Sequence, residues 1–173
     1  MGDIKIPKPV MLFASIIYNN EHTLSNILNI LEEKIGRISE KTMKIPFNHT
    51  DYYSEEMGME LYRIFVLFGS LVGRDCLIET KLKTNAIEKD LSTEEKRQVN
   101  IDPGYISLEN IILATTKNYT HRVYMGSGIY GDLTLIYKKG GYKPLEWTYP
   151  DYAGSDIVSI FNRWREHYKR MLA

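Results

Sequence analysis

The sequence predicts a single-domain α+β fold, and three observations support this prediction. Apolar runs of strand length alternate with two amphipathic helical segments over the first hundred residues. Glycine-rich turns then separate further strand-like segments, a pattern that is typical of antiparallel hairpins. The chain has 173 residues and no repeat, linker or low-complexity tract, so we expect one domain over residues 1–173.

The first strand is expected over Pro9–Tyr18, an apolar run rich in aromatic and branched residues that ends at two asparagines. The next segment, Glu21–Ile35, repeats leucine and isoleucine at intervals of three and four residues. Asn20 can cap the start of this helix, and Gly36 can end it. The beginning of the chain therefore predicts a strand followed by an amphipathic helix.

Two further strands are expected around a polar insert. Lys41–Phe47 alternates polar and apolar side chains, and Leu61–Phe68 is a second apolar run. The insert between them covers Asn48–Gly58. These segments predict the second and third strands of the sheet.

A second helix is expected over Asp75–Asp90, with Asp75 as its cap. Its expected apolar face consists of Ile78, Leu82 and Ala86. Val99–Ile106 can form a fourth strand if Pro103 lies at an edge or a bulge, because proline lacks the N–H that a central strand needs. The resulting order, strand, helix, strand, strand, helix, strand, predicts a ferredoxin-like βαββαβ core with an antiparallel sheet.

The last seventy residues are expected to extend this core with a hairpin region and a closing helix. Ser107 can cap a short helix over Leu108–Thr116. Strands are then expected over Arg122–Met125, Leu133–Tyr137 and Lys143–Trp147. Ser155–Leu172 is expected to be an amphipathic helix behind a serine cap. Its apolar stripe consists of Ile157, Ile160, Phe161, Trp164, Tyr168 and Leu172.

The charge and cysteine content exclude several classes of protein. Lysine plus arginine and aspartate plus glutamate both total 22, so no overall positive charge would attract nucleic acid or an anionic membrane. Cys76 is the single cysteine, which excludes an intramolecular disulfide and fits a reducing compartment. The first residues carry charges and prolines and lack a long apolar run, so we expect a cytoplasmic protein without a membrane segment.

One glycine motif resembles a phosphate-binding loop. Gly126–Gly131 has the spacing G-x-G-x-x-G, but a strand-like segment follows it where a dinucleotide site requires a helix. We therefore interpret it as a tight hairpin, with a phosphate clamp as the alternative. No G-x-x-x-x-G-K-[ST] segment is present, so the sequence does not support a P-loop GTPase or ATPase.

The polar and aromatic residues between Val99 and Tyr152 suggest a binding site for a small anionic ligand or a nucleotide, and the protein could be an enzyme acting on an anionic substrate. Lys117 and Arg122 would neutralise the anionic group, and His121 is the candidate for proton transfer. Acidic side chains would bind hydroxyl groups or a metal. The complete candidate set is Asp51, Asn100, Asp102, Thr116, Lys117, His121, Arg122 and Tyr130.

A metal site is weighed at one place. His49 and Asp51 stand two residues apart, with Glu55 and Glu56 close by, but no second histidine accompanies them. We interpret this segment as a polar loop and predict no metal ligands. No cofactor can be inferred from these residues.

Two other classes of protein remain open. Eight of the thirteen tyrosines lie between Tyr105 and Tyr152, and exposed aromatic residues on a ferredoxin-like sheet could stack RNA bases. That reading requires a basic surface around Tyr105, Tyr124 and Tyr130. Alternatively, the stripe of the last helix could pack against a protein partner, which would make the chain an interaction subunit.

Several segments resemble the domain-of-unknown-function 4416 family, a group of prokaryotic proteins. They are KPV near the start, TDYYSEEMG, NIDPGY, LATTK, HRVYMGSGIYGDLTL and EWTYPDY. The resemblance runs from about Pro7 to Tyr152. Proteins of this group are sometimes called GTP-binding proteins, although this chain lacks the phosphate loop of P-loop GTPases. The resemblance implies no particular catalytic residue.

Overall fold

A computed structural model describes residues 2–47, 54–58, 60–94 and 96–173. Its strands are β1 Val10–Tyr18, β2 Ile38–Lys41, β3 Ile45–Pro46, β4 Tyr62–Val72, β5 Val99–Ile106, β6 Asn110–Thr115, β7 Arg122–Gly126, β8 Ile129–Lys138 and β9 Gly141–Pro144. Its helices are α1 Glu21–Lys34, α2 Ser54–Met57, α3 Cys76–Asp90, α4 Pro150–Ala153 and α5 Ser155–Met171. The protein is therefore a mixed α+β fold, as the sequence predicts.

The strands form one antiparallel sheet. Their order is β2-β4-β1-β5-β6-β8-β7, with β3 paired to β4 and β9 paired to β8. Strand β1 lies between β4 and β5, and all nine of its residues are buried. A strand that is covered on both faces is expected to be continuously apolar, which explains the first run of the sequence.

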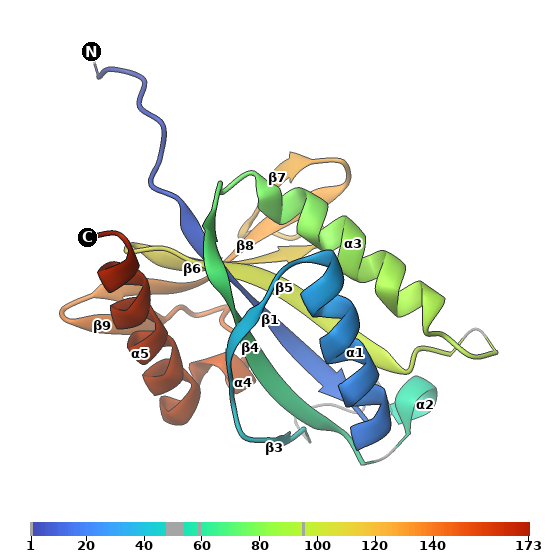
Figure 1. Cartoon of the computed structure of the whole chain (residues 1–173). Coiled ribbons are helices and arrows are strands. Elements are labelled where there is room, and N and C mark those ends of the chain that lie inside the picture. The colour runs from blue at the N-terminus through green and yellow to red at the C-terminus, as the bar shows by residue number, and fades with distance from the viewer. Residues whose placement is uncertain (1, 48–53, 59, 95) are drawn as a thin grey trace.

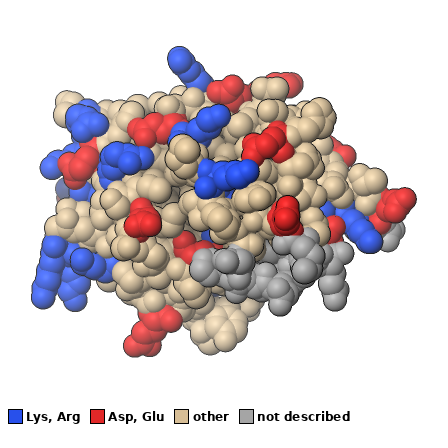
Figure 2. All heavy atoms as spheres, turned by 90° about the horizontal axis from the view of Figure 1, so that it is seen from below, with Lys and Arg blue, Asp and Glu red and all other residues tan. Residues whose placement is uncertain are grey.

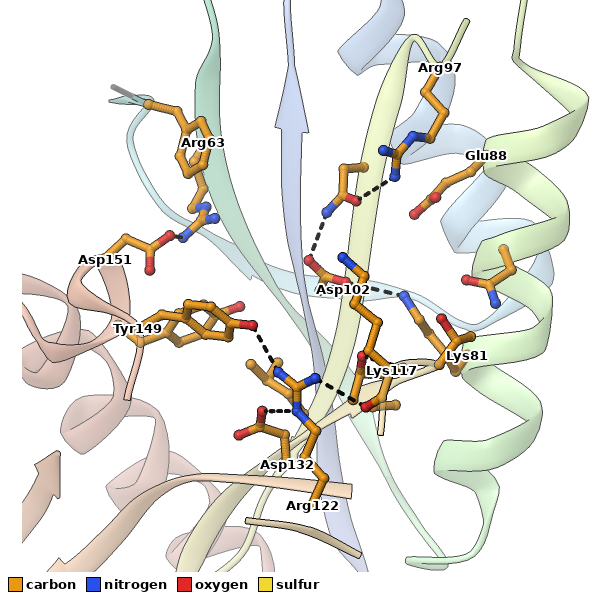
Figure 3. Close-up of a pocket in the computed structure, with 18 of the residues that line it drawn as sticks. Arg63, Lys81, Glu88, Arg97, Asp102, Lys117, Arg122, Asp132, Tyr149 and Asp151 are labelled. Atoms are coloured by element: carbon orange, nitrogen blue, oxygen red, sulfur yellow. Dashed lines mark hydrogen bonds and ion pairs between the residues drawn. The ribbon is translucent and has the colours of Figure 1, made fainter. Parts of the chain in front are cut away.

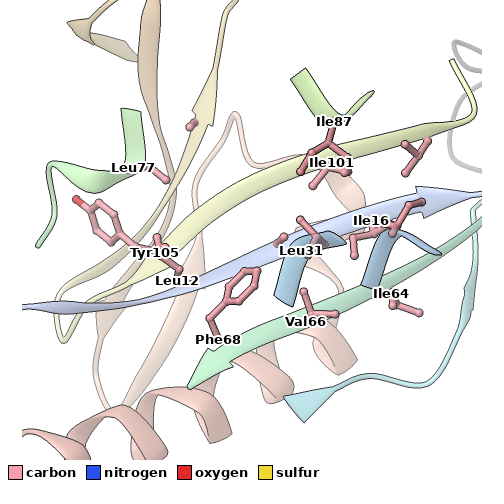
Figure 4. Close-up of a cluster of buried hydrophobic side chains, with 14 of the residues drawn as sticks. Leu12, Ile16, Leu31, Ile64, Val66, Phe68, Leu77, Ile87, Ile101 and Tyr105 are labelled. Carbon is pink, nitrogen blue, oxygen red and sulfur yellow. The ribbon is translucent and has the colours of Figure 1, made fainter. Parts of the chain in front are cut away.

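Helices α1 and α3 cover one face of the sheet (Figure 1). Leu31 of α1 and Ile87 of α3 pack against Ile16, Ile64 and Ile101 in the core between these layers (Figure 4). The Asn20 side chain accepts a hydrogen bond from the Thr23 N–H at 2.8 Å, so the predicted cap of α1 is confirmed.

Helix α5 covers the opposite face. The Phe161 ring makes edge-to-face contacts with Phe13 and Phe65, with centroid distances of 5.0 and 5.6 Å. Trp164 and Tyr168 are fully buried beside it. The apolar stripe of α5 therefore packs on the protein's own core. The predicted cap is wrong, because Gly154 precedes the helix and no side chain caps it.

The predicted helix over Leu108–Thr116 is wrong, because this segment forms β6. The Ser107 hydroxyl accepts hydrogen bonds from the N–H groups of Glu109 and Asn110, but these bonds close a turn between β5 and β6. Pairing of β6 with both β5 and β8 outweighs the local capping signal. The periodicity of this short apolar run fits either a helix or a strand, so its conformation is determined by pairing with the neighbouring strands.

The predicted second strand is also misplaced. The chain forms β2 before it and only the short β3 within it, while β4 extends beyond the predicted third strand. The last predicted strand, Lys143–Trp147, is β9, which starts earlier and ends at Pro144. Hairpin formation at the glycine motif is confirmed, because Ser127 and Gly128 have positive φ angles of 51° and 77° between β7 and β8.

Helix α3 forms where it is predicted, but it buries a different face. Leu82 is 45% exposed, and Ala86 is exposed as well, so only Ile78 of the expected apolar stripe packs against the core. Asp75 precedes the helix without a side-chain capping bond. The buried residues of α3 are Leu77, Thr80, Lys81, Thr84, Ile87 and Glu88. Two of these are charged, and their partners lie in the cavity described below. None of the described helices is long and apolar enough to cross a membrane.

Candidate functional site: a charged cavity between α3 and β5

The site lies beside β5, a strand that is fully paired on one side and only partly paired on the other. Strand β5 pairs with β1 from Val99 to Ile106, but its described pairing with β6 covers only Gly104 to Ile106. Pro103 lies where β5 is unpaired on the β6 side, so its missing N–H leaves no gap in a ladder. The condition that the sequence sets for Pro103 is therefore met.

Two side chains of α3 take the place of a neighbouring strand at this edge. The Ile101 N–H donates to Glu88 Oε1 at 2.6 Å, and Lys81 Nζ donates to the Ile101 carbonyl oxygen at 3.2 Å. Backbone groups buried without a partner are costly, so these contacts stabilise the open half of β5. The arrangement explains why α3 turns charged residues toward the sheet.

A cavity of about 570 Å³ lies beside this edge, between α3 and the segment that carries α4 (Figure 3). Alternation along β5 directs Asn100 and Asp102 to the face opposite α1, where they enter the cavity. The cavity is lined by Phe47, Arg63, Lys81, Asn85, Glu88, Arg97, Asn100, Asp102, Leu113, Ala114, Thr115, Thr116, Lys117, Arg122, Asp132, Tyr149, Pro150, Asp151 and Tyr152.

Buried charge is concentrated around this cavity. Among the residues that the structure describes, five charged side chains are buried, and four of them line the cavity. The four are Arg63, Lys81, Glu88 and Asp132. Charged groups are rarely buried unless they are paired, because leaving water is expensive. A single cavity that collects them is a candidate for a functional site.

A hydrogen-bonded chain of side chains runs along the β5 wall. Lys81 Nζ lies 3.2 Å from Asp102 Oδ1, and the Asn100 amide donates to Asp102 Oδ2 at 2.7 Å. Arg97 donates to Asn100 Oδ1 at 3.4 Å and to Glu56 Oε2 at 2.5 Å. Burial alone would raise the pKa of Asp102, but Lys81 and Asn100 outweigh burial and lower it. Asp102 is therefore ionised at neutral pH.

Glu88 differs from the other carboxyl groups of the cavity. Burial raises the pKa of Glu88 to about 7, although the Lys81 charge and the Ile101 N–H oppose the shift. Asp102, Asp132 and Asp151 each form an ion pair with a basic side chain. No such pair involves Glu88 within the described residues. Glu88 can therefore gain or lose a proton near neutral pH.

Arg122 holds the opposite wall together. Its guanidinium donates to Asp132 Oδ2 at 2.8 Å, to the Lys117 carbonyl oxygen at 3.0 Å and to the Tyr149 hydroxyl at 2.8 Å. Burial alone would lower the pKa of Arg122, but Asp132 and Tyr149 raise it overall. Three segments that are distant in sequence, at Lys117, Asp132 and Tyr149, thus meet on one side chain.

The remaining wall contains an ion pair between Arg63 of β4 and Asp151 of α4. The Arg63 guanidinium also lies 4.6 Å from the centre of the Phe47 ring. Arg63 Nε and the Tyr152 hydroxyl are buried and have no hydrogen-bond partner among the residues that the structure describes. Burial raises the pKa of Tyr152, so its hydroxyl is neutral.

The structure brings five of the predicted site residues together in the cavity lining: Asn100, Asp102, Thr116, Lys117 and Arg122. It places two others elsewhere. His121 Nε2 lies 3.2 Å from Asp132 Oδ2, and its ring stacks on Trp147 with a centroid distance of 5.1 Å. Tyr130 packs edge to face against Tyr124 at 5.3 Å.

The predicted residue Asp51, together with His49, lies outside the described residues. The described part of the chain contains no group of three His, Cys, Asp or Glu side chains that could hold a metal ion.

Sequence reasoning missed most of the charged lining, in particular Arg63, Lys81, Glu88, Asp132 and Asp151. Two signals were available for some of them. Lys81, Asn85 and Glu88 recur at helical spacing, which places them on one face of α3. Arg63 interrupts an otherwise apolar strand. A charged residue at a position that periodicity assigns to the interior indicates a buried partner.

The geometry bears on the RNA-binding alternative. Tyr105 is only 9% exposed and belongs to the core under α3, and helices cover both faces of the central strands. Basic and acidic side chains are interspersed over the centre of the face shown in Figure 2. The central strands of the sheet therefore do not present an open aromatic platform of the kind that RNA-binding modules use.

These features define an α+β protein with a charged, ligand-sized cavity beside the part of β5 that does not pair with β6. A family model described as a domain of unknown function, DUF4416, matches residues 8–168. The chain belongs to this family, as its motifs predict. No curated protein and no solved structure matches the chain.

Proposed function

We propose that the cavity between α3 and β5 binds a small ligand with an anionic group. The observation that carries this proposal is the gathering of four of the five buried charged side chains of the described residues around one cavity. Burying charges costs free energy that a purely structural core avoids. Natural proteins tolerate such a cost mainly at functional sites.

The charge balance of the lining favours an anion. Five basic side chains and four carboxyl groups line the cavity, and Glu88 is partly protonated at neutral pH. Lys117 and Arg97 are the most exposed of the basic residues that line the cavity. A carboxylate, sulfate or phosphoryl group would find charge-assisted donors there.

The size and composition of the cavity suit a ligand as large as a nucleotide. Its volume of about 570 Å³ lies within the usual range for small-molecule sites. The Tyr149 ring is 48% exposed and is fixed by Arg122, so it could stack on a planar group. Without a P-loop, side chains rather than a glycine-rich backbone would hold the phosphates.

The experiment is a thermal-shift screen followed by calorimetry with sulfate, succinate, AMP and GTP. At least one of these should raise the melting temperature in a concentration-dependent manner. Lys117→Gln should weaken the binding of that compound about tenfold, whereas Lys143→Gln on the exposed part of β9 should leave it unchanged. Failure of all four compounds to bind would contradict the proposal.

We also propose that β1, α1, β2, β4, α3 and β5 form a ferredoxin-like unit. The supporting observations are the strand order β2-β4-β1-β5, antiparallel pairing throughout and the placement of α1 and α3 on one face. An experimental structure in which β1 is not flanked by β4 and β5 would contradict this assignment.

A further inference from the structure

Glu88 occupies an unusual position on the α3 wall of the cavity. Its side chain is buried, and one carboxyl oxygen accepts the Ile101 N–H at 2.6 Å. Figure 3 shows the carboxyl group turned from α3 toward the side of the cavity where Arg97 and Asp102 lie. The Glu88 carboxyl group therefore lines the cavity and also accepts a hydrogen bond from the edge of β5.

The structural role at Ile101 does not require an acid. A glutamine carbonyl oxygen at this position could accept the same N–H hydrogen bond without the cost of burying an ionisable group. The other three carboxyl groups of the cavity offset that cost through ion pairs with Lys81, Arg122 and Arg63. Within the described residues, Glu88 has no ion-pair partner that would hold it ionised. An acid at this position thus has a use beyond closing the strand edge.

The charged groups around Glu88 act in opposite directions. Lys81 on α3 and Arg97 before β5 favour the ionised form, whereas Asp102 on β5 disfavours it. Burial outweighs the two basic groups, so both protonation states are accessible near neutral pH. An anion that enters the cavity adds a further negative charge, which shifts this balance toward the protonated acid.

We propose that Glu88 is the proton-exchanging group of the cavity, so that a small dianion binds together with one proton. This inference rests on the proposed function. The proton comes from solvent as the anion enters, forms the O–H bond of the Glu88 carboxylic acid, and returns to solvent on release. In the bound state, the neutral acid can donate a hydrogen bond to the ligand instead of repelling it. Glu88 thereby takes the role that the sequence suggests for His121, which lies outside the cavity lining.

The test is calorimetric titration with sulfate, which stays fully ionised between pH 5.5 and 8.5. For the wild-type protein, the affinity should fall with rising pH and approach a tenfold loss per pH unit above the Glu88 midpoint. Titration in two buffers of different ionisation enthalpy should show uptake of close to one proton at the alkaline end. The measurement of proton uptake uses the wild-type protein alone, so it does not depend on whether a variant folds.

Two variants sharpen the test. Glu88→Gln keeps the acceptor for the Ile101 N–H and should bind sulfate with an affinity that no longer depends on pH. Glu79→Gln removes an exposed carboxyl group of the same helix, which pairs with Lys83 at 2.8 Å, and should keep the wild-type pH dependence. Circular dichroism checks that both variants are folded.

The outcomes separate this inference from the proposed function. Sulfate binding that is independent of pH and takes up no proton would contradict the inference. It would still agree with the proposed function, the binding of an anion in the cavity. Binding of AMP without any binding of sulfate would also contradict it, because a small dianion should enter with the proton. If none of the screened anions binds either the wild-type protein or Glu88→Gln at any pH, the proposed function itself fails.

Discussion

The Lys81 ammonium group lies 3.2 Å from the Ile101 carbonyl oxygen, at the edge of β5 that faces away from β1. The same ammonium group lies 3.2 Å from Asp102 Oδ1. One buried side chain thus replaces a strand contact and neutralises a carboxylate in the cavity. This double role links the stability of the sheet edge to the charge of the site.

Replacement of Lys81 by methionine is predicted to destabilise the fold by about 2 kcal/mol, because it leaves the Ile101 carbonyl and the Asp102 carboxylate without their partner. Urea unfolding at pH 7 measures this change. Lys83→Met on the exposed face of α3 should change stability by less than about 0.5 kcal/mol. Equal losses in the two variants would argue against the special role of Lys81.

The pKa of Glu88 predicts a particular pH dependence of stability. Its folded-state pKa of about 7 lies above the ordinary value of 4.5, so the folded state binds the proton more tightly than the unfolded state. The stabilising contribution is therefore present in full below pH 4.5 and is lost as the pH rises to about 7. The loss amounts to at most about 3 kcal/mol.

Glu88→Gln isolates this effect from the titration of other groups. The difference in free energy of unfolding between the variant and the wild-type protein should shift in favour of the variant by about 2 kcal/mol between pH 5 and pH 8. Chemical denaturation at four pH values measures it. Parallel stability curves for the two proteins would show that Glu88 does not titrate in this range.

Arg122→Lys is predicted to destabilise the fold by about 2 to 3 kcal/mol, because lysine cannot hold three divergent acceptors at once and Asp132 is buried. Hydrogen exchange should become faster at Lys117 and around Tyr149. Arg163→Lys, at an exposed position of α5, is the matched control and should leave exchange unchanged at both places. Unaltered hydrogen-exchange protection in Arg122→Lys would contradict the proposal that Arg122 holds these segments together.

Phe161→Ala is predicted to cost about 3 to 5 kcal/mol, because the ring fills the space between Phe13 and Phe65 under α5. Met171→Ala near the exposed end of the same helix should cost less than about 1 kcal/mol. Thermal unfolding compares the two. A fully stable Phe161→Ala variant would indicate that the stripe of α5 serves a partner rather than the core.

The sequence predicts the elements whose burial follows simple periodicity. Strand β1 is apolar except for Ser15 because it is covered on both faces, and α1 and α5 carry one regular stripe each. The face of α3 could not be predicted from apolar spacing. Its Lys81 and Glu88 are buried by contacts with Ile101, which lies 20 and 13 residues further along the chain.

The site was predictable only in part for the same reason. Asn100, Asp102 and Lys117 belong to a polar stretch that contrasts with its surroundings, so composition alone draws attention to them. Arg63 and Asp151 meet across 88 residues, a pairing that no local pattern contains. His121 attracts attention as a titratable residue, but it directly precedes β7, whose Arg122 pairs with Asp132 of β8, and its ring lies against Asp132 and Trp147.

The most direct test of the anion site is an NMR titration of the ¹⁵N-labelled protein with sulfate at pH 6. The predicted result is a saturable set of amide shifts centred on Asn100, Ile101, Lys117 and Tyr149, which surround the cavity. The shifts at the β7–β8 turn, around Ser127 and Gly128, should stay within noise. Saturable shifts confined to that turn, or the absence of saturable shifts with sulfate, succinate, AMP and GTP alike, would contradict the assignment of the cavity as the binding site.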